Sequence, residues 1–264
     1  MTTWGRHRRP LIIAHRGASA ERPENTLAAF RLAVEQGADG VELDVMRCAS
    51  GEVVVFHDDD LKRLAGRPES IRALTWSQLR EVRVGGEPIP TLEEVLEALE
   101  SVGPRTLVNI ELKAPDHRGL AHTRELRDDG LAFEVAAIAR RAQLGQRALV
   151  SSFHPLLLAR FRRAAPEIAT GILIHHDLRA PLRDAWLAPL LRPAALHPEA
   201  VMVTRRAVQQ WHRQGRAVNV WTVDDPAELR FLAAVGVDGI ITNTPGAART
   251  VLGAISPAQR SSSS

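Results

Sequence analysis

The chain has 264 residues, 45% of them hydrophobic and 25% charged, which is enough to bury one sizeable core and favours a single domain. Cys48 is the only cysteine, so the composition excludes an intrachain disulfide and a cysteine-based zinc site. The net charge is only +3 and no basic stripe interleaved with aromatic side chains is present, which argues against a nucleic-acid partner.

Apolar runs of strand length alternate with stretches of helical periodicity along almost the whole chain. Strands are predicted at residues 11–14, 41–45, 53–56, 107–112, 148–151, 170–174, 218–223 and 239–242. Helices are predicted at residues 25–36, 91–100, 125–143, 155–164, 205–214 and 226–235. This alternation predicts an α/β fold with a parallel sheet, and eight such repeats predict a closed (β/α)8 TIM barrel. Residues 201–203 are a ninth strand candidate. If they form a barrel strand, the numbering of the strands after residue 174 shifts by one.

These elements predict one TIM-barrel domain over residues 11–256. Residues 1–10 are expected to form a flexible arm and residues 257–264 a flexible tail, because neither carries a core pattern. The connection between the third and fourth predicted strands exceeds one crossover helix and contains a helical pattern at 75–82, which indicates a small insertion, about 59–105, near the barrel mouth. No apolar run approaches the roughly 20 residues of a membrane span, and the arm lacks a signal-peptide core, so we expect a cytoplasmic location.

Four of the predicted strands end in ionisable residues. They are His15 and Arg16 after the first strand, Glu42 and Asp44 on the second, His57 after the third, and Glu111 and Lys113 on the fourth. In a (β/α)8 barrel the carboxyl ends of all strands surround one mouth, where reactive side chains gather. We therefore expect these residues to form one site.

The three carboxylates in this set predict a metal site. Glu42 and Asp44 are two residues apart on a strand, so both point to the same face. Together with Glu111 they would repel one another unless a cation neutralised them. We expect one divalent ion that prefers oxygen ligands, Mg²⁺ or Ca²⁺, with Mn²⁺ as a further option. The alternative is a structural network in which the acids pair with arginine or lysine.

His15 and His57 are predicted to be the catalytic residues. Each ends an apolar strand at the expected mouth, where two imidazoles can serve as general base and general acid near neutral pH. Arg16 and Lys113 are the cations best placed to hold a phosphate group, and both could also act as counter-ions to the carboxylates.

The ordered motifs of the chain resemble those of the glycerophosphodiester phosphodiesterase family. The resemblance begins with H-R-G at 15–17, P-E-N-T at 23–26 and G-A-D-G-V-E-L-D-V at 37–45. It continues with V-V-F-H-D at 54–58, I-P-T-L-E-E-V at 89–95, I-E-L-K at 110–113, S-F at 152–153, V-W-T-V at 220–223 and G-V-D-G-I-I-T at 236–242. The chain departs from the family pattern at residues 47–51 and at Asn243, where an aspartate is common.

This resemblance implies a barrel enzyme that hydrolyses glycerophosphodiesters to sn-glycerol 3-phosphate and an alcohol. It implies a divalent ion at Glu42, Asp44 and Glu111, and matches His15 and His57 to the family's acid and base. By the same resemblance Arg16, Lys113, Trp221 and Phe153 bind the substrate, with Trp221 as an aromatic wall beside the glycerol.

Two other functions stay open at this point. One is a phospholipase D-like activity on lysophospholipids or sphingolipids, which would require an apolar mouth built from insertion residues such as Leu61, Leu64, Ile71, Leu74 and Trp76. The other is a barrel that binds phosphodiesters without hydrolysing them. The preferred alcohol, the attacking group and the oligomeric state, with a homodimer as one option, are left undecided by the sequence.

Overall fold

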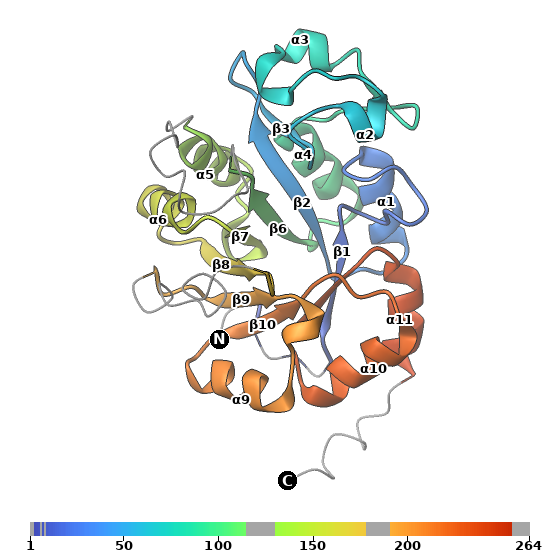
Figure 1. The fold of residues 1–264 in the computed structure, drawn as a ribbon, viewed down its shortest axis with the longest axis vertical. Coiled ribbons are helices and arrows are strands. Elements are labelled where there is room, and N and C mark those ends of the chain that lie inside the picture. Colours follow the sequence, from blue (N-terminus) through green and yellow to red (C-terminus); the bar gives the residue numbers. More distant parts are fainter. Residues whose placement is uncertain (1–2, 6, 8, 115–129, 178–190, 255–264) are drawn as a thin grey trace.

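The fold is a closed barrel of parallel strands surrounded by helices (Figure 1). The structure, a computed structural model, describes residues 3–5, 7, 9–114, 130–177 and 191–254. Eight strands form the barrel: β1 (Leu11–His15), β2 (Gly40–Arg47), β6 (Leu107–Leu112), β7 (Ala148–Ser152), β8 (Ala169–Ile174), β9 (Ala195–Pro198), β10 (Ala217–Val220) and β11 (Gly239–Thr242). All neighbouring pairs are parallel, and the β1–β2 pairing closes the ring.

The predicted barrel is confirmed, but one predicted strand lies outside it and one barrel strand is absent from the prediction. The run at 53–56, predicted as the third strand, forms β3 (Val53–Val55), which pairs antiparallel with the end of β2 and is outside the barrel. The strand missing from the prediction is β9, whose sequence Ala-Leu-His-Pro is fully buried but has too little apolar character to be recognised. The alternative strand at 201–203 overlaps a short 3-10 helix, Ala200–Met202.

The helices that cover the barrel agree closely with the predicted ones. They are α1 (Leu27–Glu35), α4 (Leu92–Val102), α5 (Leu131–Arg141), α6 (Pro155–Ala164), α9 (Arg205–Arg213), α10 (Pro226–Val235) and α11 (Pro245–Gly253). Residues 125–129 of the predicted helix 125–143 lie outside the described residues, and α11 was not predicted. Local sequence sets several helix starts: Thr26 caps α1 through Ala29 N, and Thr91 and Glu94 form a capping box on α4.

The insertion packs as a small unit with its own core at one end of the barrel (Figure 1). It contains α2 (Lys62–Ala65), a 3-10 helix (Ile71–Ala73), α3 (Trp76–Leu79) and the short hairpin β4 (Arg83–Val84) and β5 (Glu87–Pro88). Leu61, Ile71 and Leu79 are completely buried, and Leu64 and Trp76 pack against the same cluster. The apolar residues of the insertion therefore fill a core and do not form an apolar mouth.

The segment 1–10 is not a free arm at its described residues. Trp4 is 1% exposed and belongs to an apolar cluster with Leu11 and Ile13 of β1. Arg9 forms a two-pronged ion pair with Asp39, with nitrogen–oxygen distances of 2.6 and 2.8 Å. A tryptophan buries a large apolar area when it packs, which is why this segment is held against the barrel. The predicted tail at 257–264 lies outside the described residues, and within the described part no helix is long and apolar enough to cross a membrane.

Candidate active site

The nine residues predicted for the site lie together at the carboxyl ends of the barrel strands. A cavity of about 60 Å³ is lined by eight of them: His15, Arg16, Glu42, His57, Glu111, Lys113, Phe153 and Trp221. The ninth, Asp44, contacts two of these residues, Arg16 and Lys113. Asn109, Leu173 and Ile241 complete the cavity wall. The barrel thus brings together side chains from strands that are far apart in the sequence.

Strand pairing places the three carboxylates next to one another. In the β2–β6 register Asp44 is opposite Glu111, and Glu42 precedes Asp44 by two residues on the same face of β2. Their exposed fractions are 4% for Glu42, 1% for Asp44 and 9% for Glu111. One oxygen from each carboxylate lies within 4.8 Å of the other two. This compact group of oxygen ligands could hold a divalent cation that prefers oxygen.

Two cations contact the carboxylate group. Lys113 Nζ, on a side chain that is 3% exposed, lies 2.9 Å from Glu111 Oε1 and 3.4 Å from Asp44 Oδ1. Arg16 Nε lies 3.1 Å from Asp44 Oδ2. Burial alone would raise the pKa of Asp44, but the charges of Lys113 and Arg16 outweigh it and hold that pKa below its ordinary value. Asp44 is therefore ionised in the folded protein.

Glu42 has the opposite electrostatic environment. Burial, followed by the neighbouring Asp44 and Glu111 carboxylates, raises the pKa of Glu42 well above its ordinary value. The two cations oppose this shift but do not overcome it. An additional positive charge at the carboxylates would bring Glu42 back to its ionised form.

His15 is oriented by a hydrogen-bonded pair outside the cavity. Asn243 donates from its backbone N and from Nδ2 to Asp224, at 2.8 and 2.7 Å, so its Oδ1 faces His15. His15 Nδ1 then donates to Asn243 Oδ1 at 2.7 Å. This leaves Nε2 with its lone pair, 3.9 Å from Glu42 Oε2. Burial, and then the charge of Arg16, lower the pKa of His15 to about 4, so the imidazole is neutral at neutral pH.

His57 is linked to Arg16 by a chain of ion pairs through the insertion. His57 Nδ1 lies 2.6 Å from Asp58 Oδ1, and Arg63 of α2 donates to Asp58 Oδ2 at 2.7 Å. Arg63 also donates to both oxygens of Glu24, at 2.7 and 2.8 Å. Glu24 in turn accepts from Arg16 at 2.8 Å. The insertion therefore fixes the orientation of a candidate catalytic histidine and of a candidate phosphate ligand.

The aromatic side of the cavity is formed by Phe153 and Trp221. Their rings meet edge to face, with centroids 5.6 Å apart and an interplanar angle of 83°. Trp221 Nε1 donates to the backbone oxygen of His197 at 2.7 Å, which fixes the indole plane. Such a rigid apolar face suits the carbon side of a small polyol.

Three asparagines of the site were missed as site residues, although Asn243 was noted as a departure from the family. Asn25 Nδ2 donates to Asp44 Oδ2 at 2.9 Å, Asn109 lines the cavity, and Asn243 holds His15. Asn25 has φ 57°, a left-handed conformation in which asparagine is favoured among residues with a side chain. An asparagine immediately before the helix-capping Thr26 could have been used to predict a tight turn. Only the fold shows that the Asn25 side chain of this turn contacts Asp44.

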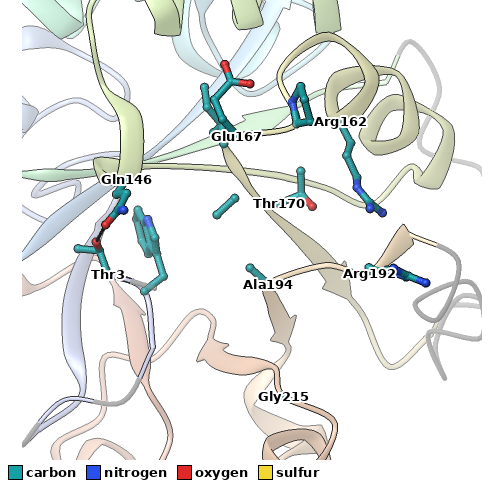
Figure 2. Close-up of a pocket in the computed structure, with 12 residues that line it drawn as sticks. Thr3, Gln146, Arg162, Glu167, Thr170, Arg192, Ala194 and Gly215 are labelled. Carbon is teal, nitrogen blue, oxygen red and sulfur yellow. Dashed lines mark hydrogen bonds between the residues drawn. The ribbon is translucent and has the colours of Figure 1, made fainter. Parts of the chain in front are cut away.

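A larger cavity, about 630 Å³, lies at the opposite end of the barrel (Figure 2). Its lining includes Thr170 at the start of β8, Ala194 just before β9 and Gly215 just before β10, so it belongs to the amino-terminal face. None of the predicted site residues lines it. Active sites of TIM-barrel enzymes are found at the carboxyl-terminal face, so the smaller cavity is the candidate active site.

Comparisons with known proteins agree with this placement. Residues 15–247 match the model of the family described as Glycerophosphoryl diester phosphodiesterase family. The chain is 33% identical over 245 residues to a glycerophosphodiester phosphodiesterase of Caldanaerobacter subterraneus, with 89% of this chain and 94% of that protein covered.

Two solved structures are also similar. A glycerophosphodiester phosphodiesterase from Thermotoga maritima is 33% identical with a TM-score of 0.73, over 92% of this chain and 98% of that one. An Oleispira antarctica phosphodiesterase, solved in complex with the product sn-glycerol-3-phosphate, is 29% identical with a TM-score of 0.78, over 93% of this chain and 98% of that one. Both likenesses extend over nearly the full length of the compared chains.

Proposed function

The chain belongs to the glycerophosphoryl diester phosphodiesterase family, and from this premise we propose that it hydrolyses glycerophosphodiesters to sn-glycerol 3-phosphate and an alcohol in the cavity at the carboxyl end of its barrel. The observation that carries the proposal is the cavity itself: two histidines, two cations, Glu42 and Glu111 line it, and Asp44 completes the carboxylate group beside it. A charged diester with a small polyol matches that lining.

The residues present fit a divalent cation. Glu42, Asp44 and Glu111 supply hard oxygen ligands, and the raised pKa of Glu42 reflects buried negative charge that its neighbours do not fully neutralise. Asp44 Oδ1 is buried and, among the described residues, has an ion-pair contact with Lys113 Nζ at 3.4 Å but accepts no hydrogen bond. These three residues would hold Mg²⁺, Ca²⁺ or Mn²⁺. When bound, such an ion supplies charge neutralisation and polarises the phosphate ester.

His15 and His57 handle the protons in this proposal. His15 presents an unprotonated Nε2 to the cavity, which suits a general base, because Nδ1 is committed to Asn243. His57 is held through Nδ1 by Asp58, so in its doubly protonated form its Nε2–H can donate a proton to the leaving alcohol. The matching of ring nitrogens to roles rests on the hydrogen bonds each ring already makes.

Arg16 and Lys113 neutralise the phosphate, and the aromatic pair holds the glycerol. Both cations border the cavity while contacting carboxylates, so each can serve the substrate and the acidic group together. Phe153 and Trp221 form the wall against which the carbon side of glycerol packs. Two attacking groups fit this arrangement, a water molecule or a glycerol hydroxyl that passes through a cyclic phosphate, and detection of that cyclic product distinguishes them.

The decisive experiment measures release of sn-glycerol 3-phosphate from glycerophosphocholine and glycerophosphoethanolamine by the purified protein. It is run with EDTA and with Mg²⁺, Ca²⁺ or Mn²⁺, for the wild type, Glu42→Gln and the control Glu97→Gln, an exposed carboxylate of α4. We expect cation-dependent release that is lost in Glu42→Gln and kept in the control. Binding without turnover under every cation would instead favour the non-catalytic barrel.

Lysophospholipid hydrolysis is a weaker alternative in this structure. Its expected docking residues Leu61, Ile71 and Leu74 are between 0% and 9% exposed, inside the insertion core. An assay of a lysophospholipid beside its deacylated diester tests the point directly. A clear preference for the lysophospholipid would refute the assignment to small soluble diesters.

A further inference from the structure

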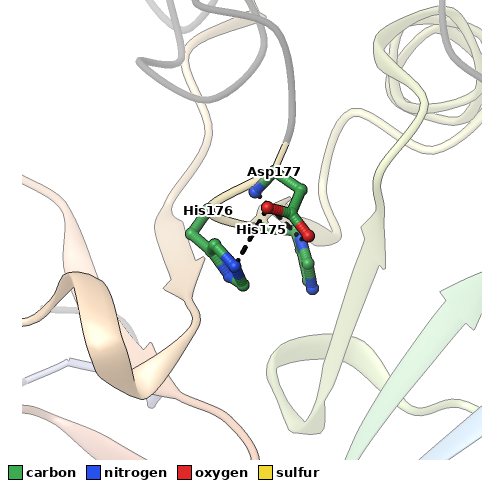
Figure 3. A group of neighbouring side chains, drawn as sticks. All are labelled: His175, His176 and Asp177. Atoms are coloured by element: carbon green, nitrogen blue, oxygen red, sulfur yellow. Dashed lines mark hydrogen bonds and ion pairs between the residues drawn. The ribbon is translucent and has the colours of Figure 1, made fainter.

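A second group of possible metal ligands lies at the same end of the barrel as the acidic site. His175, His176 and Asp177 directly follow β8, and their side chains gather at one point (Figure 3). In the part of the chain that the structure describes, this is one of two groups whose ligand atoms all lie within 4.8 Å of one another, and Glu42, Asp44 and Glu111 form the other. Glu199, which follows β9, contacts both histidines.

Contacts with two carboxylates divide the nitrogens of the two imidazoles into two sets. Glu199 Oε2 lies 2.5 Å from His176 Nδ1 and 3.6 Å from His175 Nε2. The opposite nitrogens both face Asp177: His176 Nε2 lies 3.0 Å from Oδ1 and His175 Nδ1 lies 3.9 Å from Oδ2. The backbone N–H of Asp177 donates to the lone pair of His175 Nδ1 at 3.1 Å. An ion bound at Nδ1 would take the place of this hydrogen bond.

A ligating histidine typically donates its other ring N–H to a carboxylate, which fixes the tautomer and the ring orientation. Glu199 is such a carboxylate for His176, at 2.5 Å from Nδ1. The His175 ring stacks on the His176 ring, with centroids 4.5 Å apart and an interplanar angle of 26°. Ligand atoms of a tetrahedral zinc ion lie roughly 3.3 Å apart. The nitrogen–oxygen distances of 3.0 and 3.9 Å at Asp177 bracket that spacing.

We propose that His175 Nδ1, His176 Nε2 and the Asp177 carboxylate form a binding site for a divalent transition-metal ion such as Zn²⁺, with Glu199 orienting His176 and the ion replacing the Asp177 N–H at His175 Nδ1. Two histidines and one carboxylate select Zn²⁺, Fe²⁺ or Co²⁺ over Mg²⁺ and Ca²⁺, because imidazole is a softer ligand than oxygen. Three protein ligands leave coordination positions open to solvent or to an anion. The site is chemically distinct from the oxygen-only group, and the proposal does not depend on the hydrolytic function.

The site lies at the edge of the substrate cavity. The His175 ring is 5.9 Å from the Trp221 ring, centroid to centroid, and Trp221 lines that cavity. The side chains of His176 and Asp177 are 49% and 76% exposed, so an ion can reach them from solvent. The His175 side chain is 34% exposed, and neither histidine belongs to a buried core, so alanine at either position should leave the fold intact.

The test measures zinc bound per chain after equilibrium dialysis against Zn²⁺ in excess Mg²⁺, so that the oxygen-only site is held by Mg²⁺. Parallel samples in a Glu42→Gln background remove any zinc that still binds there. We expect one zinc ion in both backgrounds, lost in His175→Ala and in His176→Ala and kept in the control His7→Ala, an exposed histidine elsewhere. Glu199→Gln should weaken zinc binding on the order of 10- to 100-fold, as loss of an orienting carboxylate does.

A spectroscopic measurement with Co²⁺ provides an independent readout. Co²⁺ with imidazole ligands and fewer than six neighbours absorbs visible light strongly, whereas Co²⁺ among six oxygens absorbs weakly. The wild type and Glu42→Gln should both show the strong band, and His176→Ala should lack it. Equal zinc content and equal Co²⁺ spectra in the wild type and the two histidine variants would overturn the proposal, as would a wild type that retains no zinc.

Discussion

Replacing Lys113 by methionine tests how the carboxylate group is neutralised. Lys113 contacts Glu111 at 2.9 Å and Asp44 at 3.4 Å and is 3% exposed. Among the described residues its loss leaves Asp44 with Arg16 at 3.1 Å and removes the ion pair of Glu111. Breaking a buried ion pair by removing one partner costs about 3–5 kcal/mol. We expect the free energy of unfolding of Lys113→Met, measured with urea in EDTA, to fall by about that amount.

A divalent cation should recover much of this loss, because it supplies the missing charge to the same oxygens. An ion present at about 100 times its dissociation constant stabilises the folded state by about 2.7 kcal/mol, and each tenfold gain in affinity adds about 1.4 kcal/mol. Lys113→Met removes a cation that competes for Asp44 and Glu111, so Mg²⁺ or Ca²⁺ should stabilise the variant more than it stabilises the wild type.

The assay is a pair of urea titrations, in EDTA and in saturating Mg²⁺ or Ca²⁺, for the wild type, Lys113→Met and Lys62→Met. Lys62 is the only other lysine of the chain, and its side chain is 67% exposed, so its replacement should be nearly neutral in both buffers. Our reasoning fails if the cation stabilises Lys113→Met no more than it stabilises the wild type. It also fails if Lys62→Met loses as much stability as Lys113→Met.

The remaining predictions concern the motif glycine, the histidines and acid pH. Gly17→Ala should lower the free energy of unfolding by about 2–5 kcal/mol, because φ is +85° and a Cβ would lie 2.6–2.8 Å from atoms of Ala29. The control Gly86→Ala, at φ +91° with no atom within 4 Å, should lose only the free energy of the strained backbone conformation. Equal losses of the two variants in urea titrations would contradict this. His15→Ala and His57→Ala should each reduce turnover on the order of 10² to 10⁴-fold with unchanged circular dichroism, and wild-type turnover in either variant would refute the acid/base assignment. Burial lowers the pKa of His197 from 6.5 to about 3, so the unfolded chain binds the extra proton first and stability falls as pH drops below 6.5. Between about pH 7 and about pH 5 the wild type should lose about 2 kcal/mol more than His197→Gln, and parallel pH profiles would argue against a buried neutral imidazole.

The strand that sequence reasoning missed shows what a hydrophobic pattern can and cannot resolve. The run at 53–56 is rich in valine and does form a strand. That strand pairs antiparallel with the end of β2 and therefore lies outside the barrel. In β9 a histidine, His197, occupies a buried position inside the barrel where the pattern would lead one to look for an apolar residue. Its Nε2 lies 3.1 Å from Asn219 Nδ2, a contact that stabilises the buried ring. Pattern alone cannot identify such a strand, because the partner that makes the buried histidine acceptable belongs to β10.

The supporting residues of the site show the same limit. Asn25, Arg63 and Asn243 lie 19, 5 and 228 positions from the residues they hold, Asp44, Asp58 and His15 respectively. Only Arg63 is near its partner in the chain, and even there the pairing depends on the fold of α2. The sequence marked Asn243 as a departure from the family but did not reveal that Asp224 turns its amide so that Oδ1 faces the histidine.

The sequence by itself predicted the fold class, because alternation of strands and helices favours a parallel sheet and eight repeats favour a barrel. It placed seven ionisable residues at one mouth, because the carboxyl ends of barrel strands meet. The family, and with it Trp221 and Phe153, came from the resemblance of the ordered motifs. The tertiary structure alone decided which runs are barrel strands, which charges neutralise which, and how each histidine is turned. It also brought His175, His176 and Asp177 against Glu199, which follows a different strand. These features depend on distances of a few ångströms between residues far apart in the chain, and such distances are fixed only when the barrel closes.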